Sequence, residues 1–336
     1  MMRRIMKKLS YILLFVMLYS LVGCGDEVKQ GERRKVLGPV QSAPYEMLIV
    51  CDKTWYKSDA GKKFFDMANT FMPGMPQSEP IFKLICINTG SFSKTFMSYG
   101  SIIFVNINHK YEKPEFIKQR DMYAKPQVVV TLNSPDPKGI DQLVDEHGAE
   151  IIEMMESNEI KRAMKILKKN HSGVVSKQAS KMFGCEWHMP DVITQIKPGK
   201  DFFWASSGDN VYNACMYSYP WVSNETFTKD FFIEKRDSFM RKNIEGEQIG
   251  QHMTTNASTV STKERMVDGH YVQEVHGMWE MTNDMMGGPF VSYVQLDSIN
   301  KRIIVTEGFV YLPNKQKKKM VHALEAGLRT LKMNAY

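Results

Sequence analysis

Glu46-Met47-Leu48-Ile49-Val50-Cys51-Asp52 is a nearly continuous apolar run between two acidic residues. Such a run is typical of a strand that is buried on both faces. Strand-like runs follow at 82–87, 101–107 and 127–132, and shorter helical patterns at 61–71 and 91–99 lie between them. The alternation of strands with helices predicts a layered α/β sheet for this half of the chain.

The longest helical pattern lies downstream of this predicted sheet, over residues 140–167. Apolar residues recur there at spacings of three and four, and Asn170 to Gly173 interrupt the pattern before a further short helix at 175–183. His147 falls at the edge of the apolar stripe, so we expect it to pack there and to bind no ligand.

The second half of the chain has a different pattern. Strands are predicted at 201–207 and 211–219, joined by a hairpin at Gly208-Asp209-Asn210, and a helix at 228–243 begins at a Thr228 N-cap. Residues 250–260 fit either a strand or an exposed loop. Strands at 271–281, 290–296 and 302–311 predict an antiparallel meander, and a last helix at 315–333 closes it. The predicted fold class is therefore α+β (mixed α/β), with an N-terminal layered sheet and a C-terminal meander closed by a helix.

The N-terminal pattern predicts a secretory signal peptide. Basic residues precede an uncharged run from Tyr11 to Val22, which is shorter than the roughly 20 apolar residues that span a bilayer. Leu21-Val22-Gly23-Cys24 resembles the lipobox of bacterial lipoproteins, which implies that Cys24 is lipidated. The predicted organisation is a signal peptide at 1–23, a flexible tether at 24–44, an N-terminal α/β domain at 45–183 and a C-terminal α+β domain at 184–336.

The balance of charged residues bears on which class of partner the protein can bind. Without the signal peptide the chain has 40 basic and 37 acidic residues, a balance that argues against nucleic acid as a partner. The polar segment from Gly25 to Pro44 cannot bury enough apolar surface to fold. Its Asp26-Glu27 pair resembles the export signal of Bacteroidetes surface lipoproteins, although a solvated tether explains it equally. We expect an outer-membrane protein, lipid-anchored and either periplasmic or surface-facing.

The four cysteines that follow Cys24 have two interpretations. Cys51 and Cys86 lie in strand-like runs, so a disulfide between them is possible in an oxidising compartment. The favoured interpretation is buried free thiols, because two strands must first bring the sulfurs together. The loop Cys185-Glu186-Trp187-His188 offers a thiolate and an imidazole, but structural zinc usually takes four ligands. We predict no metal and no cofactor, with Cys185 and His188 as the candidates if one exists.

A possible acid/base group lies in the predicted meander. His270, Glu274 and His276 are separated by even numbers of residues, so a regular strand places them on one face. A carboxylate between two imidazoles suits proton transfer. The favoured interpretation is instead the exposed polar face of the meander, since polar residues are usually exposed. No phosphate-binding loop, nucleophile elbow or His-Glu-x-x-His motif accompanies them.

Two further features have both a structural and a functional interpretation. Aromatic residues gather at Phe202-Phe203-Trp204, between Tyr212 and Trp221, and at Trp279, which suits either a hairpin core or a groove for glycan or peptide. Asp297-Ser298-Ile299 resembles the Bacteroidetes O-glycosylation sequon. That pattern makes Ser298 a possible acceptor, with an ordinary turn as the favoured interpretation.

Several longer blocks carry a family resemblance. The blocks are Tyr45–Asp52, Pro73–Pro80, Val105–Asn108, Arg120–Gln127 and Gly308–Tyr311. They are similar to a domain-of-unknown-function family of Bacteroidetes lipoproteins, over essentially the whole mature chain. The resemblance implies an envelope lipoprotein and supplies no catalytic residues.

Two functional hypotheses follow from these observations. The first is a lipid-anchored envelope protein that binds an unidentified envelope protein or ligand, or assists assembly. The alternative is an envelope hydrolase or metal-dependent enzyme that acts on glycan or peptide. They differ in whether the candidate side chains converge in a concave pocket or scatter over exposed strands.

Overall fold

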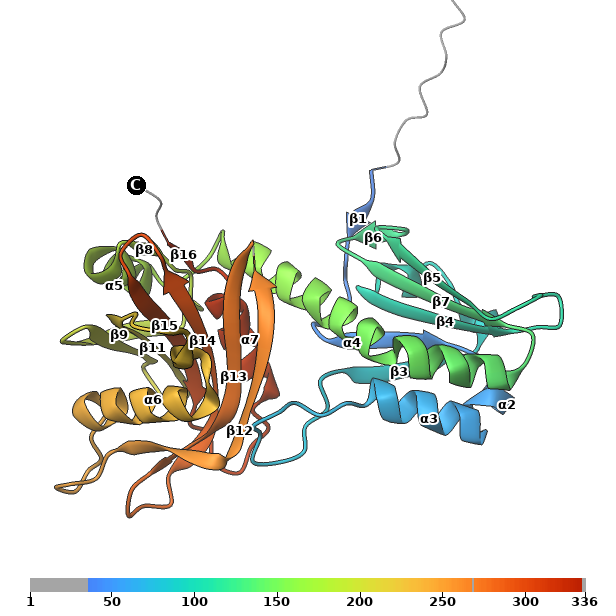
Figure 1. Cartoon of the computed structure of the whole chain (residues 1–336). Coiled ribbons are helices and arrows are strands. Elements are labelled where there is room, and N and C mark those ends of the chain that lie inside the picture. The colour runs from blue at the N-terminus through green and yellow to red at the C-terminus, as the bar shows by residue number, and fades with distance from the viewer. Residues whose placement is uncertain (1–35, 268, 334–336) are drawn as a thin grey trace, which may run out of the picture. The chain divides into compact units, whose positions relative to one another are not determined.

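The computed structural model describes residues 36–267 and 269–333, and the described residues from Gly38 onward form one compact unit. Cys24, the signal peptide and residues 24–35 of the predicted tether lie outside the described residues. The compact unit is a mixed α+β structure, which confirms the predicted fold class (Figure 1). Its ordered chain starts before residue 45, because β1 (Gly38–Pro39) pairs with β6 (Ala124–Lys125).

The first sheet has five strands. Their order is β3 (Lys83–Ile87), β2 (Glu46–Val50), β4 (Ser101–Ile107), β7 (Val128–Ser134) and β5 (Glu115–Arg120). All neighbours pair in parallel except β5, which runs antiparallel to β7 at the edge. The layered sheet is thus confirmed, but β5 was not predicted, because its mostly polar residues are exposed and give no buried pattern. The helix expected at 91–99 is wrong: two short 3-10 turns, Thr89–Ser91 and Phe96–Ser98, take its place.

Helices begin where the sequence provides caps. α3 (Asp59–Ala68) follows α2 (Lys53–Tyr56). Each of the two helices begins after a residue whose side chain accepts a hydrogen bond from a backbone N–H group of the first turn. Asp136 caps α4 (Pro137–Leu167), which is one continuous helix packed on α3, β4 and β7. His147 stacks on Phe116, with ring centroids 4.2 Å apart. Gly184 in the left-handed conformation ends α5 (Gly173–Phe183).

None of the described helices is long and apolar enough to cross a membrane.

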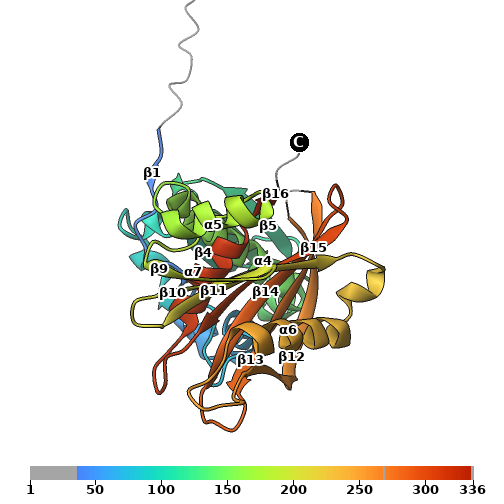
Figure 2. The ribbon, with the colours of Figure 1, turned by 90° about the vertical axis from the view of Figure 1, so that its left-hand side faces the viewer.

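The second sheet has seven antiparallel strands. Their order is β12 (Met253–Val267), β13 (His270–Met281), β14 (Gly287–Asp297), β15 (Arg302–Val310), β11 (Tyr212–Pro220), β10 (Phe202–Ser207) and β9 (Ile193–Gly199). The meander is confirmed, and the open choice for 250–260 resolves as the start of β12. Figure 2 shows α6 (Lys229–Asn243) on one face and α7 (Lys318–Leu328) on the other. The last helix ends at Leu328 rather than 333, since Lys332–Met333 (β16) pair with Cys185–Glu186 (β8).

The segment between α3 and β3 reaches the second sheet. Gly74 has a φ of +70°, and a Cβ there would lie 2.6 Å from the backbone nitrogen of Gly277 in β13. Farther along this segment, the buried Glu79 carboxylate accepts from the backbone N–H groups of Lys317, at 2.8 Å, and Lys318, at 3.1 Å. Glu79 therefore caps the N-terminus of α7 across the fold.

The face of the second sheet that α6 covers holds a fully enclosed ion pair. Arg236 of α6 and Glu307 of β15 are both 0% exposed, and two hydrogen bonds of 2.9 and 2.8 Å join them. Arg236 also donates to Thr255 at 2.8 Å, Ser292 donates to Glu307 at 2.7 Å, and the guanidinium lies 4.2 Å from the Phe290 ring centroid. We call these residues the Arg236 network.

The thiols are free in the structure. Cys51 is buried, as predicted, and Cys86 is exposed, contrary to the prediction; Cys185 and Cys215 are also buried. The sulfurs of Cys51 and Cys86 are 3.4 Å apart without a disulfide bond. The adjacent parallel strands β2 and β3 bring the two thiols together.

Candidate functional site

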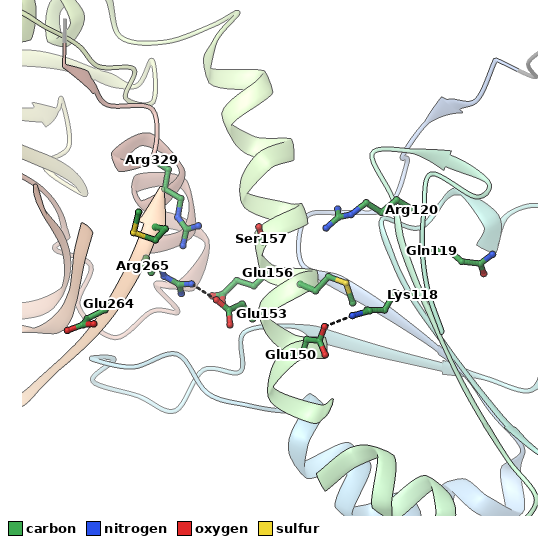
Figure 3. A pocket seen from close by; sticks show the side chains of 12 residues that line it. Lys118, Gln119, Arg120, Glu150, Glu153, Glu156, Ser157, Glu264, Arg265 and Arg329 are labelled. Atoms are coloured by element: carbon green, nitrogen blue, oxygen red, sulfur yellow. Dashed lines mark hydrogen bonds and ion pairs between the residues drawn. The ribbon is translucent and has the colours of Figure 1, made fainter. Parts of the chain in front are cut away.

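A cleft of about 760 Å³ lies beside α4, between β5 and the β12 strand (Figure 3). Its lining residues are mostly charged: Lys118, Gln119, Arg120, Glu150, Glu153, Met154, Glu156, Ser157, Glu264, Arg265, Met266 and Arg329. Basic and acidic side chains are equally numerous there. Figure 3 shows Lys118 and Arg120 on one side of α4, and Arg265 and Arg329 on the other. We call this cavity the Glu156 cleft.

Glu274 is the centre of a buried charge network at one wall of the cleft. Its carboxylate accepts two hydrogen bonds from Arg265, one from Tyr293 at 3.1 Å and one from Arg329 at 3.3 Å. His276 Nε2 lies 3.0 Å from Oε1 of the same carboxylate. Only 4% of Glu274 and 6% of His276 is exposed. We call these groups, with Glu325, the Glu274 network.

The strand pattern explains how the two β13 residues meet. Glu274 and His276 alternate with Val275, so their side chains share the face that α7 covers, while Val275 packs in the α6-side core. Tyr293 is the cross-strand neighbour of Glu274 in β14. Arg329 follows α7 directly and donates through Nε to the Tyr293 hydroxyl at 2.5 Å. The predicted shared face is confirmed, but its predicted exposure is wrong because α7 buries it.

Charge pairing governs protonation in the Glu274 network. Burial alone would raise the pKa of Glu274, but the hydrogen bonds and charges of His276 and Arg265 hold it well below its usual range. Burial would likewise lower the pKa of His276, and its contact with Glu274 raises it instead. Glu274 therefore stays ionised at neutral pH, and His276 favours its charged form.

The pKa of Glu156 in α4 is shifted in the opposite direction from that of Glu274. Burial, followed by repulsion from Glu325 and Glu274, raises the pKa of its carboxyl to about 7, although Arg265 and Arg329 act in the opposite direction. It is half-buried, and no side-chain hydrogen bond or ion pair to it is found among residues 36–267 and 269–333. Figure 3 shows its side chain directed to the same side of α4 as Arg265 and Arg329. Glu156 is thus a carboxyl that changes charge near neutral pH at the cleft.

A second cavity of about 480 Å³ shares part of this wall. Glu153, Glu156 and Arg265 line both cavities, and Glu274, His276 and Glu325 line only this one. Its other walls are largely apolar, including Phe71, Met72 and Ile152. His276 Nδ1 is buried and has no hydrogen-bond partner within the described part of the chain. An unpaired buried nitrogen beside a cavity is a place where a ligand or water can bind.

The structure brings together only part of the predicted acid/base group. Glu274 and His276 meet, whereas His270 is exposed at the first residue of β13. The arrangement therefore does not decide between the enzyme and the binding protein. Two of the three side chains converge at a cavity, as expected for an enzyme, and the third lies apart on an exposed strand end. Glu274 is also a poor proton acceptor at neutral pH, since its ionised form is strongly stabilised.

The Cys185 and His188 candidates lie in different surroundings. Burial raises the pKa of the Cys185 thiol to about 11, and this thiol contacts the Phe183 carbonyl. His188 stacks on His171 with ring centroids 3.9 Å apart, and its Nε2 lies 3.2 Å from Glu186. Among the residues that the structure describes, no group of three or more His, Cys, Asp or Glu side chains could hold a metal ion.

Ser298 lies exposed in the turn between β14 and β15. The neighbouring Asp297 carboxylate accepts from Asn300 and Arg302, which fixes the turn. The placement suits an acceptor and an ordinary turn equally, so glycosylation of Ser298 stays a prediction.

Two family models match the compact unit. A domain of unknown function (DUF8532) matches residues 41–168, and another domain of unknown function (DUF4837) matches residues 172–330. Both halves of the chain are thus similar to uncharacterised domains, which confirms the predicted resemblance at that level. The first match contains Glu156, and the second contains Arg265, Glu274 and Arg329.

Other comparisons add little. No curated protein matches the chain. A crystal structure from Bacteroides thetaiotaomicron VPI-5482 matches with a TM-score of 0.21 and 10% identity, over 45% of this chain. The chain spans 45% of that protein's length. A likeness this weak carries no argument about fold or activity.

Sequence reasoning missed Glu156, Arg265, Tyr293 and Arg329. Glu150, Glu153 and Glu156 recur every three residues on α4, which is typical of a solvated helix face. That spacing did place three acids along one side of a helix, and this was the available signal. The arginines come from β12 and from the residue after α7, so only the folded chain brings them to Glu274.

Proposed function

We propose that this protein is a lipid-anchored cell-envelope lipoprotein whose folded part binds a small polar ligand in the Glu156 cleft. The anchor part of the proposal rests on the lipobox-like sequence ending at Cys24. The binding part rests on one observation: Glu156 is a carboxyl without a protein partner among the described residues, at the wall of a charged cleft.

The charges of the cleft indicate the class of ligand. Lys118 pairs with Glu150 at 2.7 Å, and Arg265 pairs with Glu153 at 3.0 Å, so these groups are already partly neutralised. Arg120 is exposed at one wall, and Glu156 lies at the other. A ligand that complements both must carry a negative and a positive group. A short peptide with charged side chains and free ends has this chemistry.

Binding of a cationic group beside Glu156 has a measurable signature. The ligand stabilises the ionised carboxylate, so the pKa of Glu156 falls from about 7 and binding at or below neutral pH releases a proton. Calorimetry in buffers of different ionisation enthalpy detects this proton directly.

The test uses the tripeptide Lys-Ala-Glu with free ends and the mature full-length chain. We expect saturable binding with proton release at pH 6.5. The substitution Glu156→Gln should weaken binding at least about tenfold, which corresponds to ~1.4 kcal/mol. Glu146→Gln on the same helix but outside the cleft is the matched control and should bind normally. Equal affinity in Glu156→Gln and the unsubstituted chain would exclude the cleft as the site.

The anchor is tested separately. Cys24→Ala should abolish lipidation and release the protein from the membrane fraction, whereas Cys51→Ala should leave the protein in it. Density-gradient separation of the membranes then tests the outer-membrane location, and protease accessibility on intact cells distinguishes a surface-facing from a periplasmic protein. Membrane retention and globomycin-sensitive processing of Cys24→Ala would contradict the lipoprotein assignment.

One observation favours hydrolysis as a second candidate function. Glu156 and Glu274 line the same cavity and have pKa values shifted in opposite directions, which is the usual arrangement of a proton donor and an ionised carboxylate. In this function Glu156 donates its proton to the leaving group of a glycan or peptide. Turnover of 4-methylumbelliferyl glycosides or labelled casein should then decline above about pH 7 and vanish in Glu156→Gln.

A further inference from the structure

A third cavity, of about 450 Å³, lies on the α6 side of the second sheet, away from the Glu156 cleft. Four aromatic side chains line it: Trp204, Trp279, Phe309 and Tyr311. The ring centroids of Trp279 and Phe309 are 5.6 Å apart, and those of Trp279 and Tyr311 are 6.0 Å apart. Trp279 and Phe309 are buried, whereas Trp204 and Tyr311 are half-buried and accessible. We call this cavity the aromatic pocket.

The polar edges of both indoles are already satisfied. Trp204 Nε1 donates to the Asn213 side chain at 3.0 Å, and Trp279 Nε1 donates to the Val310 carbonyl at 3.2 Å. Asn213 in turn donates to the Asn210 carbonyl at 2.8 Å. These groups are therefore engaged within the protein, and the half-buried rings of Trp204 and Tyr311 offer a ligand mainly their π faces, which attract positive charge.

The charged groups at the pocket have one sign. Asp209, Glu245 and Glu247 contribute to its lining, and no basic side chain does. Hydrogen bonds from Ser207 and Val211 hold the pKa of Asp209 below its usual range, so this carboxylate stays ionised. Lys197, on the neighbouring strand β9, lies with Nζ 6.0 Å from the Trp204 ring centroid. Lys197 is not part of the pocket lining, and its charge lies near the Trp204 ring.

We propose that the aromatic pocket binds an organic cation with a methylated ammonium group. Aromatic faces attract such a cation electrostatically, and the attraction grows as the cation is desolvated. The three methionines that share the lining, Met253, Met281 and Met286, provide apolar contact for its methyl groups. An anionic ligand meets three carboxylates here, and a neutral sugar finds the Asn213 amide already occupied. This site is independent of the Glu156 cleft.

The experiment compares choline with 3,3-dimethylbutan-1-ol, which has the same shape without the charge. Tryptophan fluorescence of the mature full-length chain should change saturably with choline. The neutral isostere should bind at least about fivefold more weakly, which corresponds to ~1 kcal/mol. Trp204→Leu should remove the choline response. Trp221→Leu, which changes an indole outside the pocket, is the matched control and should retain it.

Several results would overturn the proposal. Equal binding of the two compounds would show that charge plays no part, and cellobiose binding in place of choline would identify a sugar site. No saturable response to choline up to about 50 mM would exclude the site, since weaker binding falls outside the usual range of specific recognition. Glu247→Gln tests the charge without removing a ring. It should weaken choline binding and leave the isostere unaffected, while equal thermal unfolding of all variants confirms their folding.

Discussion

The two faces of the seven-stranded sheet each bury an arginine–glutamate network, and the two networks differ in completeness. On the α6 face, Arg236 and Glu307 satisfy each other, with Thr255 and Ser292 at the remaining positions. On the α7 face, Glu274 is surrounded by partners, but His276 Nδ1 has none in the described chain and Glu156 faces a cleft. Burial of charge is thus common to both faces. Residues of the Glu274 network line the two cavities on the α7 side, whereas no residue of the Arg236 network lines a cavity described above.

This difference separates a structural role from a functional one. A closed ion pair fixes the packing of α6 on the sheet and leaves nothing for a ligand to bind. A network with opposite pKa shifts, an unpaired nitrogen and adjacent cavities has the properties of a binding or reactive site. We therefore expect the Arg236 network to contribute to stability, and the functional role proposed above falls to the Glu274 network with Glu156.

The largest expected loss of stability comes from substitution in the Arg236 network. Arg236→Met leaves the Glu307 carboxylate buried without its partner, which should lower the free energy of unfolding by about 3–5 kcal/mol. Urea denaturation followed by tryptophan fluorescence measures this loss. The double variant Arg236→Met/Glu307→Leu should recover more than half of it, because no uncompensated charge remains. A double variant as unstable as the single one would contradict this account.

Substitution in the Glu274 network should cost less stability than substitution in the Arg236 network. Glu274→Gln leaves Arg265 and Arg329 with Glu153 and Glu325 as partners, so we expect a loss of about 2 kcal/mol at pH 7. Because folding lowers the pKa of Glu274 below 4.5, its stabilisation is complete above pH 4.5 and is lost as the pH falls further. The difference between the two proteins in denaturation midpoint should therefore shrink below pH 4.5. A constant difference from pH 7 to pH 3 would contradict the assignment.

Glu156 should show the opposite pH dependence. Folding raises its pKa from 4.5 to about 7, so the folded protein loses stability as the pH rises through this interval. Glu156→Gln removes that loss and should stabilise the protein by about 1 kcal/mol at pH 8, after allowance for solvent screening, and by much less at pH 4.5. Thermal unfolding across this pH range measures the effect, with Glu146→Gln as the unchanged control. A stabilisation independent of pH would count against a raised pKa.

The smallest effect is expected outside both networks. Lys118 and Glu150 are about half exposed, and exposed ion pairs contribute little after the entropy of two long side chains is counted. Lys118→Ala should change the free energy of unfolding by less than about 0.5 kcal/mol in urea denaturation. A loss comparable with that of Glu274→Gln would show that the charge of the cleft wall is itself structural.

The sequence predicted those elements whose pattern is local. Buried runs such as Met47–Val50 and the alternation around Glu274 depend on neighbouring residues, and both were interpreted correctly as strands. The polar edge strand β5 gave no such pattern. Exposure of the Glu274 face was misjudged because α7, which covers it, lies some 50 residues later in the chain. Glu156 resembled a surface residue for the same reason, since its environment comes from Glu325 and Glu274.

The capping of α7 by Glu79 has a consequence for the order in which the chain becomes complete. Glu79 lies 238 residues before Lys317 and accepts a hydrogen bond from its backbone N–H group. The two residues belong to the regions matched by two different family models. Glu79 is synthesised long before α7, so it has no helix to cap until the end of the chain has been made. A chain truncated before α7 leaves the charged face of the second sheet uncovered. Such a chain lacks Arg329 and exposes Glu274 and Arg265 to water, so an incomplete product is distinguishable from a finished one by this face alone.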